Sequence, residues 1–290
     1  MNRVFALIGA LVLSFVTTAS ACAADAPGTV HFTLRSDKSE ERIQADFRND
    51  EGSRHDNNWS SGFRPRDLVG LDLAGFRAGG TRPLRFSLIR EAGRIDCSGR
   101  GGGSYAEGRC GLTLDPSFVR LLDNRGIARP RPDQAFGLVV LNVSRELIDA
   151  LAAAHYPTPS AGDLMGLTAL GVDRSYIVGL ARVGYRPNKV GDLMQFKALG
   201  VTPQWIAGFV RTGYAGLPAS ELVQLKALEV TPEYIAGFDR LGYRRLPAHT
   251  LVELKAMGIT PEFVRSAAGD GQPMPDVSKL IELKIFGRRR

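Results

Sequence analysis

Hydrophobic and polar positions along this chain follow two different periods, and the change between them divides the sequence in two. Up to residue 114, several short stretches alternate apolar and polar residues, as in a strand with one buried face. From residue 115 to 287, apolar residues instead recur three and four positions apart, as on one face of a helix. The pattern predicts an α+β fold: an antiparallel β-module at residues 25–114, then an α-helical array at 115–287.

The helical part repeats with a fixed spacing. The pentads Val-Thr-Pro-Gln-Trp, Val-Thr-Pro-Glu-Tyr and Ile-Thr-Pro-Glu-Phe begin at positions 201, 230 and 259, each 29 residues after the one before. A fixed period of roughly 20 to 50 residues is typical of stacked supersecondary units. Because no insertion breaks this register, the array is expected to be an α-helical solenoid of 29-residue two-helix repeats.

Each unit carries start and stop signals for two short helices. Residues that can cap a helix N-terminus recur every 29 positions, and in four of the six units Pro follows at the first helical position. Gly recurs where the helices end, although Asn142, His155 and Glu229 replace it in three places. The predicted N-caps are Asp115, Ser144, Asp173, Thr202, Thr231 and Thr260.

The β-module is predicted from period-two alternation in three segments and from a hairpin. Residues 29–35, 42–48 and 84–88 alternate, and residues 94–99 and 104–114 flank a Gly-rich turn. The polar stretch 49–64 is expected to be a long exposed loop. The apolar stretch 67–76 is expected to be either a short helix or a further strand. Asp115 follows the last strand directly, so no linker is expected before the array.

The first 24 residues have the features of an export signal. Arg3 gives a positive start, residues 4–16 form an uncharged run of 13, and small residues follow up to Ala24. A run of this length is too short to span a bilayer as a helix. We expect a signal peptide at 1–24 and a periplasmic or secreted mature chain that is not transmembrane. A lipoprotein anchored through Cys22 is the alternative.

Cleavage would leave two cysteines, Cys97 and Cys110. If they face each other in the predicted hairpin, its midpoint falls between Gly103 and Ser104, where a tight turn belongs. An even number of cysteines in an oxidising compartment favours a disulfide bond between them. Two free buried thiols are the alternative interpretation.

Charge narrows the class of partner. Loss of Arg3 with the signal peptide lowers the formal net charge from +7 to +6, which suits contact with an anionic surface. An exported protein meets no genome, so no nucleic acid is expected as a partner. The three arginines of the 288–290 tail are expected to be solvated.

Common catalytic motifs are missing from the sequence, including His-Glu-x-x-His, Gly-x-Ser-x-Gly and the phosphate-binding Gly-rich loop. The four histidines lack partners at metal-ligand spacing. Glu91, Asp96 and Glu107 could pair as catalytic carboxylates only in principle. We therefore expect no catalytic residue, no metal and no cofactor. The alternative is an enzyme with a site in the β-module near residues 49–64.

Two series of side chains at 29-residue spacing are candidates for binding. The aromatic series either lines a groove or packs between helices, and the lysine series is either a ridge for an acidic partner or a solvated face. The aromatic series is Tyr176, Trp205, Tyr234 and Phe263, and the lysine series is Lys197, Lys226, Lys255 and Lys284. The candidate partner-binding residues are Lys197, Lys226, Lys255, Trp205 and Tyr234.

Residues 221–235 and 250–264, with their Leu-Val-x-Leu-Lys-Ala and Thr-Pro-Glu motifs, resemble helical repeats in the extracytoplasmic parts of BlaR1-like membrane metallopeptidases (the M56 family). Residues 86–118, with Arg-Glu-Ala-Gly at 90–93 and Asp-Pro-Ser-Phe at 115–118, are similar to the β-module that precedes such repeats. The membrane helices and zinc motif that define the peptidase are missing, so no catalytic residue carries over. The resemblance implies an exported accessory or sensory module.

These features together predict a non-enzymatic exported envelope protein. Its array is expected to bind a protein partner or an anionic envelope polymer, because stacked repeats form extended binding surfaces. A purely structural spacer is the remaining hypothesis.

Overall fold

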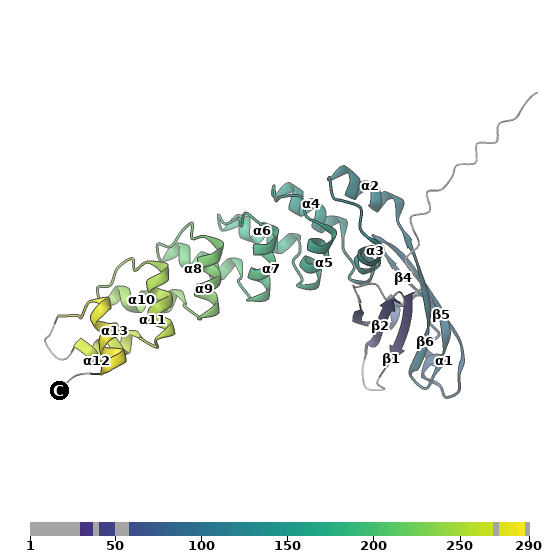
Figure 1. Ribbon diagram of the computed structural model, residues 1–290, viewed down its shortest axis with the longest axis horizontal. Coiled ribbons are helices and arrows are strands. Elements are labelled where there is room, and N and C mark those ends of the chain that lie inside the picture. Colours follow the sequence, from purple (N-terminus) through teal and green to yellow (C-terminus); the bar gives the residue numbers. More distant parts are fainter. Residues whose placement is uncertain (1–29, 37–40, 50–57, 269–272, 288–290) are drawn as a thin grey trace, which may run out of the picture.

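The computed structural model describes residues 30–36, 41–49, 58–268 and 273–287. A curled sheet stands at one end of the molecule, and a long arm of stacked helices extends from it (Figure 1). The predicted α+β fold, with a β-module followed by a helical array, is confirmed. The predicted signal peptide at 1–24, the 288–290 tail and residues 50–57 of the predicted loop lie outside the described residues.

The sheet has six antiparallel strands in the order β3-β2-β1-β6-β5-β4. Alternate side chains such as Phe32, Phe47 and Phe86 are buried on one face, as the period-two pattern predicts. The strands are β1 Val30–Arg35, β2 Ile43–Asn49, β3 Trp59–Phe63, β4 Arg82–Arg90, β5 Gly93–Gly102 and β6 Tyr105–Leu114.

The prediction of a loop through residue 64 is wrong for β3. This strand pairs with β2, placing Trp59 opposite Phe47 and Phe63 opposite Ile43. Ser61 lies between the two aromatic residues on the same side of the strand, so the alternation contains only two apolar positions and resembles a polar loop. The stretch 67–76 contains a bridge from Val69 to Ser87 and the start of helix α1 (Leu73–Arg77), after a 3-10 turn at Pro65–Asp67.

Strands β5 and β6 form the predicted hairpin, and its disulfide bond is confirmed. Cys97 and Cys110 are register partners with Cα atoms 4.1 Å apart. Gly103 and Ser104 form the turn with φ of 62° and 68°, and a positive φ at both central positions is what a type I′ hairpin turn requires. A disulfide of this kind is typical of proteins that fold in an oxidising compartment.

The array consists of six units of two helices, and both helices of each unit begin 29 residues after those of the unit before, as predicted. The first helices of the units are α2 Pro116–Asn124, α4 Arg145–Ala153, α6 Arg174–Arg182, α8 Pro203–Arg211, α10 Pro232–Arg240 and α12 Pro261–Ala268. The second helices are α3 Pro132–Val140, α5 Ala161–Ala169, α7 Val190–Ala198, α9 Ala219–Ala227, α11 Ala248–Ala256 and α13 Val277–Phe286.

The predicted residues cap the helices at both ends. Each of the six N-cap side chains accepts a hydrogen bond from the backbone N–H three residues further on. Asn142, His155 and Glu229, which replace Gly at helix ends, still adopt φ of 61°, 56° and 55°. The turns therefore stay regular without Gly, at a cost of roughly 1–2 kcal/mol for a residue such as Glu229.

Neighbouring first helices approach closely where a glycine meets a proline. A Cβ atom on Gly179, Gly208 or Gly237 would lie 2.9, 2.7 or 2.5 Å from the Cγ of the proline that begins the next first helix. Ala150 stands at the glycine position of an earlier unit, and there Arg174 replaces the proline. In that unit the glycine and the proline that would face it are therefore both replaced.

The sheet and the array share hydrophobic packing. Helix α3 lies against the sheet, where the Phe136 ring is 5.4 Å from the ring of Phe47 and 5.1 Å from that of Trp59. One core cluster runs from Val30 in β1 to Leu222 in α9. A second cluster begins in α8 and ends in α13. The inner units are therefore anchored to the sheet, while the outer units have a core of their own.

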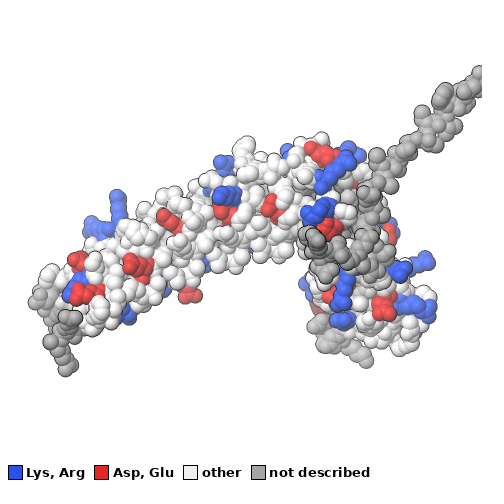
Figure 2. All heavy atoms as spheres, in the orientation of Figure 1, with Lys and Arg blue, Asp and Glu red and all other residues white. Residues whose placement is uncertain are grey.

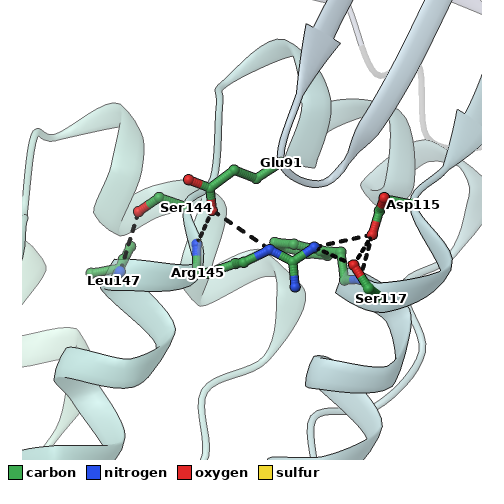
Figure 3. A network of polar contacts seen from close by, with 7 residues as sticks. Glu91, Asp115, Ser117, Ser144, Arg145 and Leu147 are labelled. Carbon is green, nitrogen blue, oxygen red and sulfur yellow. Dashed lines mark hydrogen bonds and ion pairs between the residues drawn. The ribbon is translucent and has the colours of Figure 1, made fainter.

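A polar network centred on Arg145 fixes the joint between sheet and array (Figure 3). The Arg145 guanidinium donates to Asp115 Oδ1 (3.0 Å) and to Ser117 Oγ (2.7 Å) at the start of α2. The Arg145 backbone N–H donates to Glu91 Oε2 (2.6 Å) in the turn between β4 and β5. These bonds tie α2, α4 and the edge of the sheet together without a linker.

Candidate binding face of the helical array

The aromatic series occupies the third position of each first helix, and the N-cap controls this placement. Thr202 and Thr231 accept hydrogen bonds from the backbone N–H groups of Trp205 and Tyr234 at 3.1 and 3.2 Å. Tyr234 is only 9% exposed, and Trp205 packs against both core clusters. The rings therefore pack between helices, which was one of the two interpretations of this series.

Two members of the series join neighbouring units through their hydroxyl groups. Tyr176 donates to the carbonyl of Val201 at 2.8 Å, and Tyr234 donates to that of Ile259 at 2.6 Å. Burial raises the pKa of Tyr176 to about 12 and also raises that of Tyr234. Both hydroxyls therefore remain protonated donors at neutral pH, and each holds the connector that leads into the next unit.

The predicted lysine row lies over these rings, so the two series form one ladder. Each lysine comes from the last turn of a second helix and places its ammonium over the ring of the first helix in the same unit, in cation–π geometry. The distances from Nζ to the ring centroid are 4.7 Å for Lys197 over Tyr176, 5.4 Å for Lys226 over Trp205, 5.0 Å for Lys255 over Tyr234 and 4.9 Å for Lys284 over Phe263. All but Lys284 are half-buried.

A groove of about 600 Å³ lies between α6 and α8. Arg182 from α6 and Arg211 from α8 line it, and Lys197 reaches it from the end of α7. The close contact of Gly179 with Pro203 also belongs to this groove. Among the described residues that line it there is no carboxylate, so its charged lining is entirely cationic.

A second groove, of about 550 Å³, lies between α10 and α12 and is built from equivalent positions. It has the same aromatic, glycine and proline contacts, with Tyr234 and Arg240 in the places of Tyr176 and Arg182. Two carboxylates also line it, Glu233 and Glu262, and Glu262 is paired with Arg265 at 2.8 Å. The two grooves therefore share a construction but differ in charge.

The arginines of these grooves were not among the predicted binding residues. Arg182, Arg211 and Arg240 end α6, α8 and α10 and are 29 residues apart, so the periodicity that identified the lysines also identifies them. All three are exposed. Within the described ranges, no ion pair joins any of them to a carboxylate. They are better placed than the half-buried lysines to contact a ligand.

Charged residues are mixed on the face of the arm seen in Figure 2, where basic and acidic side chains are separated by uncharged surface. Of the four lysines that stack on rings, Lys197 is the one that lines a described groove.

The carboxylates considered as catalytic candidates are held apart in the β-module. Asp96 accepts hydrogen bonds from Ser87 (2.5 Å) and Arg94 (2.6 Å), and these bonds lower the pKa of Asp96. Glu91 accepts the N–H at the start of α4, and Glu107 accepts a tyrosine hydroxyl. Each has its own partner, so the sheet does not bring them together as a pair.

No family model matches this chain, and no curated protein matches it. The resemblance of the repeats to those of BlaR1-like proteins therefore stays a prediction from sequence motifs. Within the described ranges, no group of three His, Cys, Asp or Glu side chains is arranged to hold a metal ion. In the same ranges, no single helix is long and apolar enough to cross a membrane; α5 and α6 meet that test only as a pair, bent by 85°.

Proposed function

We propose that this chain is a non-enzymatic exported envelope protein whose helical array is a binding arm. The grooves between neighbouring first helices are its contact surface. The observation that supports this function best is the recurrence of one groove, with equivalent ring, glycine, proline and arginine positions, between α6 and α8 and again between α10 and α12. Stacked repeats use extended surfaces of this kind to bind partners.

Export is part of the proposal and has two supports. The first is the N-terminal pattern of a positive residue, an uncharged run and small residues. The second is the Cys97–Cys110 disulfide, since such bonds persist in oxidising compartments. A periplasmic or secreted location fits both, and the basic mature chain fits either a protein partner with acidic groups or an anionic envelope polymer.

In this proposal the predicted lysines act together with the arginines. Lys197, Lys226 and Lys255 raise the positive potential along the arm, while their ring contacts hold each ammonium in place. Tyr234 lines the α10–α12 groove, while Trp205 packs against the core next to the α6–α8 groove. The arginines at the ends of the first helices make the direct contacts.

Site-specific photocrosslinking in the native envelope tests this function. A photoreactive residue would replace Gln204, which lines the α6–α8 groove, or Gln224, an exposed residue of α9 that lines neither groove. We expect a discrete crosslinked product from position 204 and little from position 224. No product from either position, or equal products from both, would refute a groove-based binding arm and favour the spacer hypothesis.

A further inference from the structure

The second residue of each first helix sets the charge of the groove beside it. This position holds Ser117 in α2, Ser175 in α6 and Gln204 in α8, but Glu146 in α4, Glu233 in α10 and Glu262 in α12. Only α6 and α8 are neighbouring first helices that both have a neutral residue here, and the units on either side of them have glutamate. The groove between α6 and α8 is thus a single cationic site with acidic neighbours along the arm.

We propose that this α6–α8 groove binds a short acidic segment of a protein partner, with carboxylates of that segment held by Arg182, Arg211 and Lys197. The inference rests on the proposed function and narrows its ligand to a peptide carrying clustered Asp or Glu side chains. The site is local: its volume of about 600 Å³ accommodates a few side chains rather than a long chain.

The pattern of charge favours a peptide over a polymer. A uniform polyanion would lie along several units and would need positive charge in each of them. Glu146 and Glu233 would instead repel such a polymer immediately outside the α6–α8 groove, since like charges opposed across an interface are unfavourable. A short acidic segment that stays within the groove has only the side of Arg211 near one of these glutamates, Glu233, whereas a long polymer would pass over both of them.

The side chains available suit carboxylate groups. A guanidinium offers two parallel N–H donors that match the two oxygens of a carboxylate. Both arginines are exposed, and within the described ranges neither forms an ion pair with a carboxylate. The Lys197 ammonium is held 4.7 Å from the Tyr176 ring centroid, so its charge is positioned before any ligand arrives. The Gln204 amide can donate to a peptide carbonyl.

Nearby carboxylates weaken this site only in part. Asp173 interacts electrostatically with Lys197, but one of its oxygens already accepts from Ser175 Oγ (2.7 Å) and from the Tyr176 N–H (2.8 Å) as the N-cap of α6. Glu233, in α10, interacts electrostatically with Arg211. Neither Asp173 nor Glu233 lines the groove. The three cations of the groove therefore remain in excess.

The test measures binding of a fluorescent oligoglutamate peptide to the whole mature protein by anisotropy at low ionic strength. The groove variant is Arg182→Gln with Arg211→Gln, and the matched control is Arg240→Gln with Arg265→Gln in the α10–α12 groove. Both variants lose two exposed charges, and circular dichroism confirms that both fold. We expect the groove variant to bind about tenfold more weakly or worse and the control to change less than about twofold, because charge-assisted contacts are lost only in the first.

Equal weakening in both variants would show that net charge alone attracts the peptide and would overturn the assignment to this groove. Absence of oligoglutamate binding to the unaltered protein would also overturn it. Binding of dextran sulfate, a uniform polyanion, in place of oligoglutamate would overturn the peptide class but leave the proposed binding arm in place. Crosslinking at position 204 without oligoglutamate binding would likewise overturn this inference alone, whereas absence of both would overturn the binding arm as well.

Discussion

Gly208 lies in the middle of α8, where glycine normally weakens a helix. Replacing such a glycine by alanine ordinarily stabilises a protein by about 0.5–1 kcal/mol, because alanine has the better helix propensity. In this protein a Cβ atom at position 208 would lie 2.7 Å from Cγ of Pro232 at the start of α10. We therefore predict that Gly208→Ala destabilises the array.

The size of the effect follows from two opposing contributions. Overpacking a close contact costs about 1–3 kcal/mol, and a rigid proline ring at the start of a helix has little freedom to move aside. Subtracting the gain in helix propensity leaves a net loss of about 1–2 kcal/mol in the free energy of unfolding. Pairing Gly208→Ala with Pro232→Ala should recover most of this loss, since removing the proline ring removes the Cγ atom that the new Cβ would meet.

Urea denaturation followed by tryptophan fluorescence measures this effect directly. Trp205 lies in the same helix as Gly208, and a Trp59→Phe background removes the other tryptophan from the signal. Gly191→Ala in α7 is the matched control, because a Cβ atom there meets nothing within 4 Å. If Gly208→Ala stabilised the protein as the control does, the glycine–proline contact would not determine the spacing of the helices.

Three further predictions concern the turns, the joint and the hairpin. Glu229→Gly should raise the free energy of unfolding by about 0.5–1 kcal/mol, because glycine relieves the φ of 55°; unchanged urea denaturation would refute this. Hydrogen bonds from Ser117 and the Phe118 N–H lower the pKa of Asp115 below 3.8, so its contribution to stability is present above that pH and is lost as pH falls through the folded pKa. Asp115→Asn should remove this acid-dependent loss, measured as hydrogen exchange of α2 against pH, and an unchanged pH profile would count against it. Replacing Cys97 and Cys110 by alanine should lower the free energy of unfolding by about 3 kcal/mol, as expected for a disulfide that closes a short loop; a thermal melt no different from that of the intact protein would contradict this.

Most of the array could be predicted from the sequence because its signals are local and repeated. The N-cap at Thr202, for example, needs only the next three residues to make its hydrogen bond, and the same signal returns in every unit. Strand β3 could not be predicted in this way. It has two apolar residues, Trp59 and Phe63, and depends on pairing with the preceding strand β2 across a polar connection.

The grooves could not be predicted from the sequence. They contain contacts such as that between Gly179 and Pro203, which joins two different units. The lysines and the aromatic residues were both found by periodicity, but the stacking of Lys226 over Trp205 depends on how the two helices of a unit pack. Arg211 follows the same 29-residue period, but its role as a candidate binding residue depends on the groove beside it, which the sequence does not show.

The division of the hydrophobic core has a mechanical consequence for the arm. The inner cluster continues without a break from the sheet to Leu222, and the outer cluster runs from Phe209 to Leu280, with Trp205 in contact with both. A load pulling on the distal end would open the outer cluster first, because that cluster is not braced by the sheet. The α6–α8 groove lies at the boundary, because α8 contributes Ile206 to the inner cluster and Phe209 to the outer one. Tension on the tip would therefore reach the groove through its α8 wall, while its α6 wall stays braced by the inner cluster.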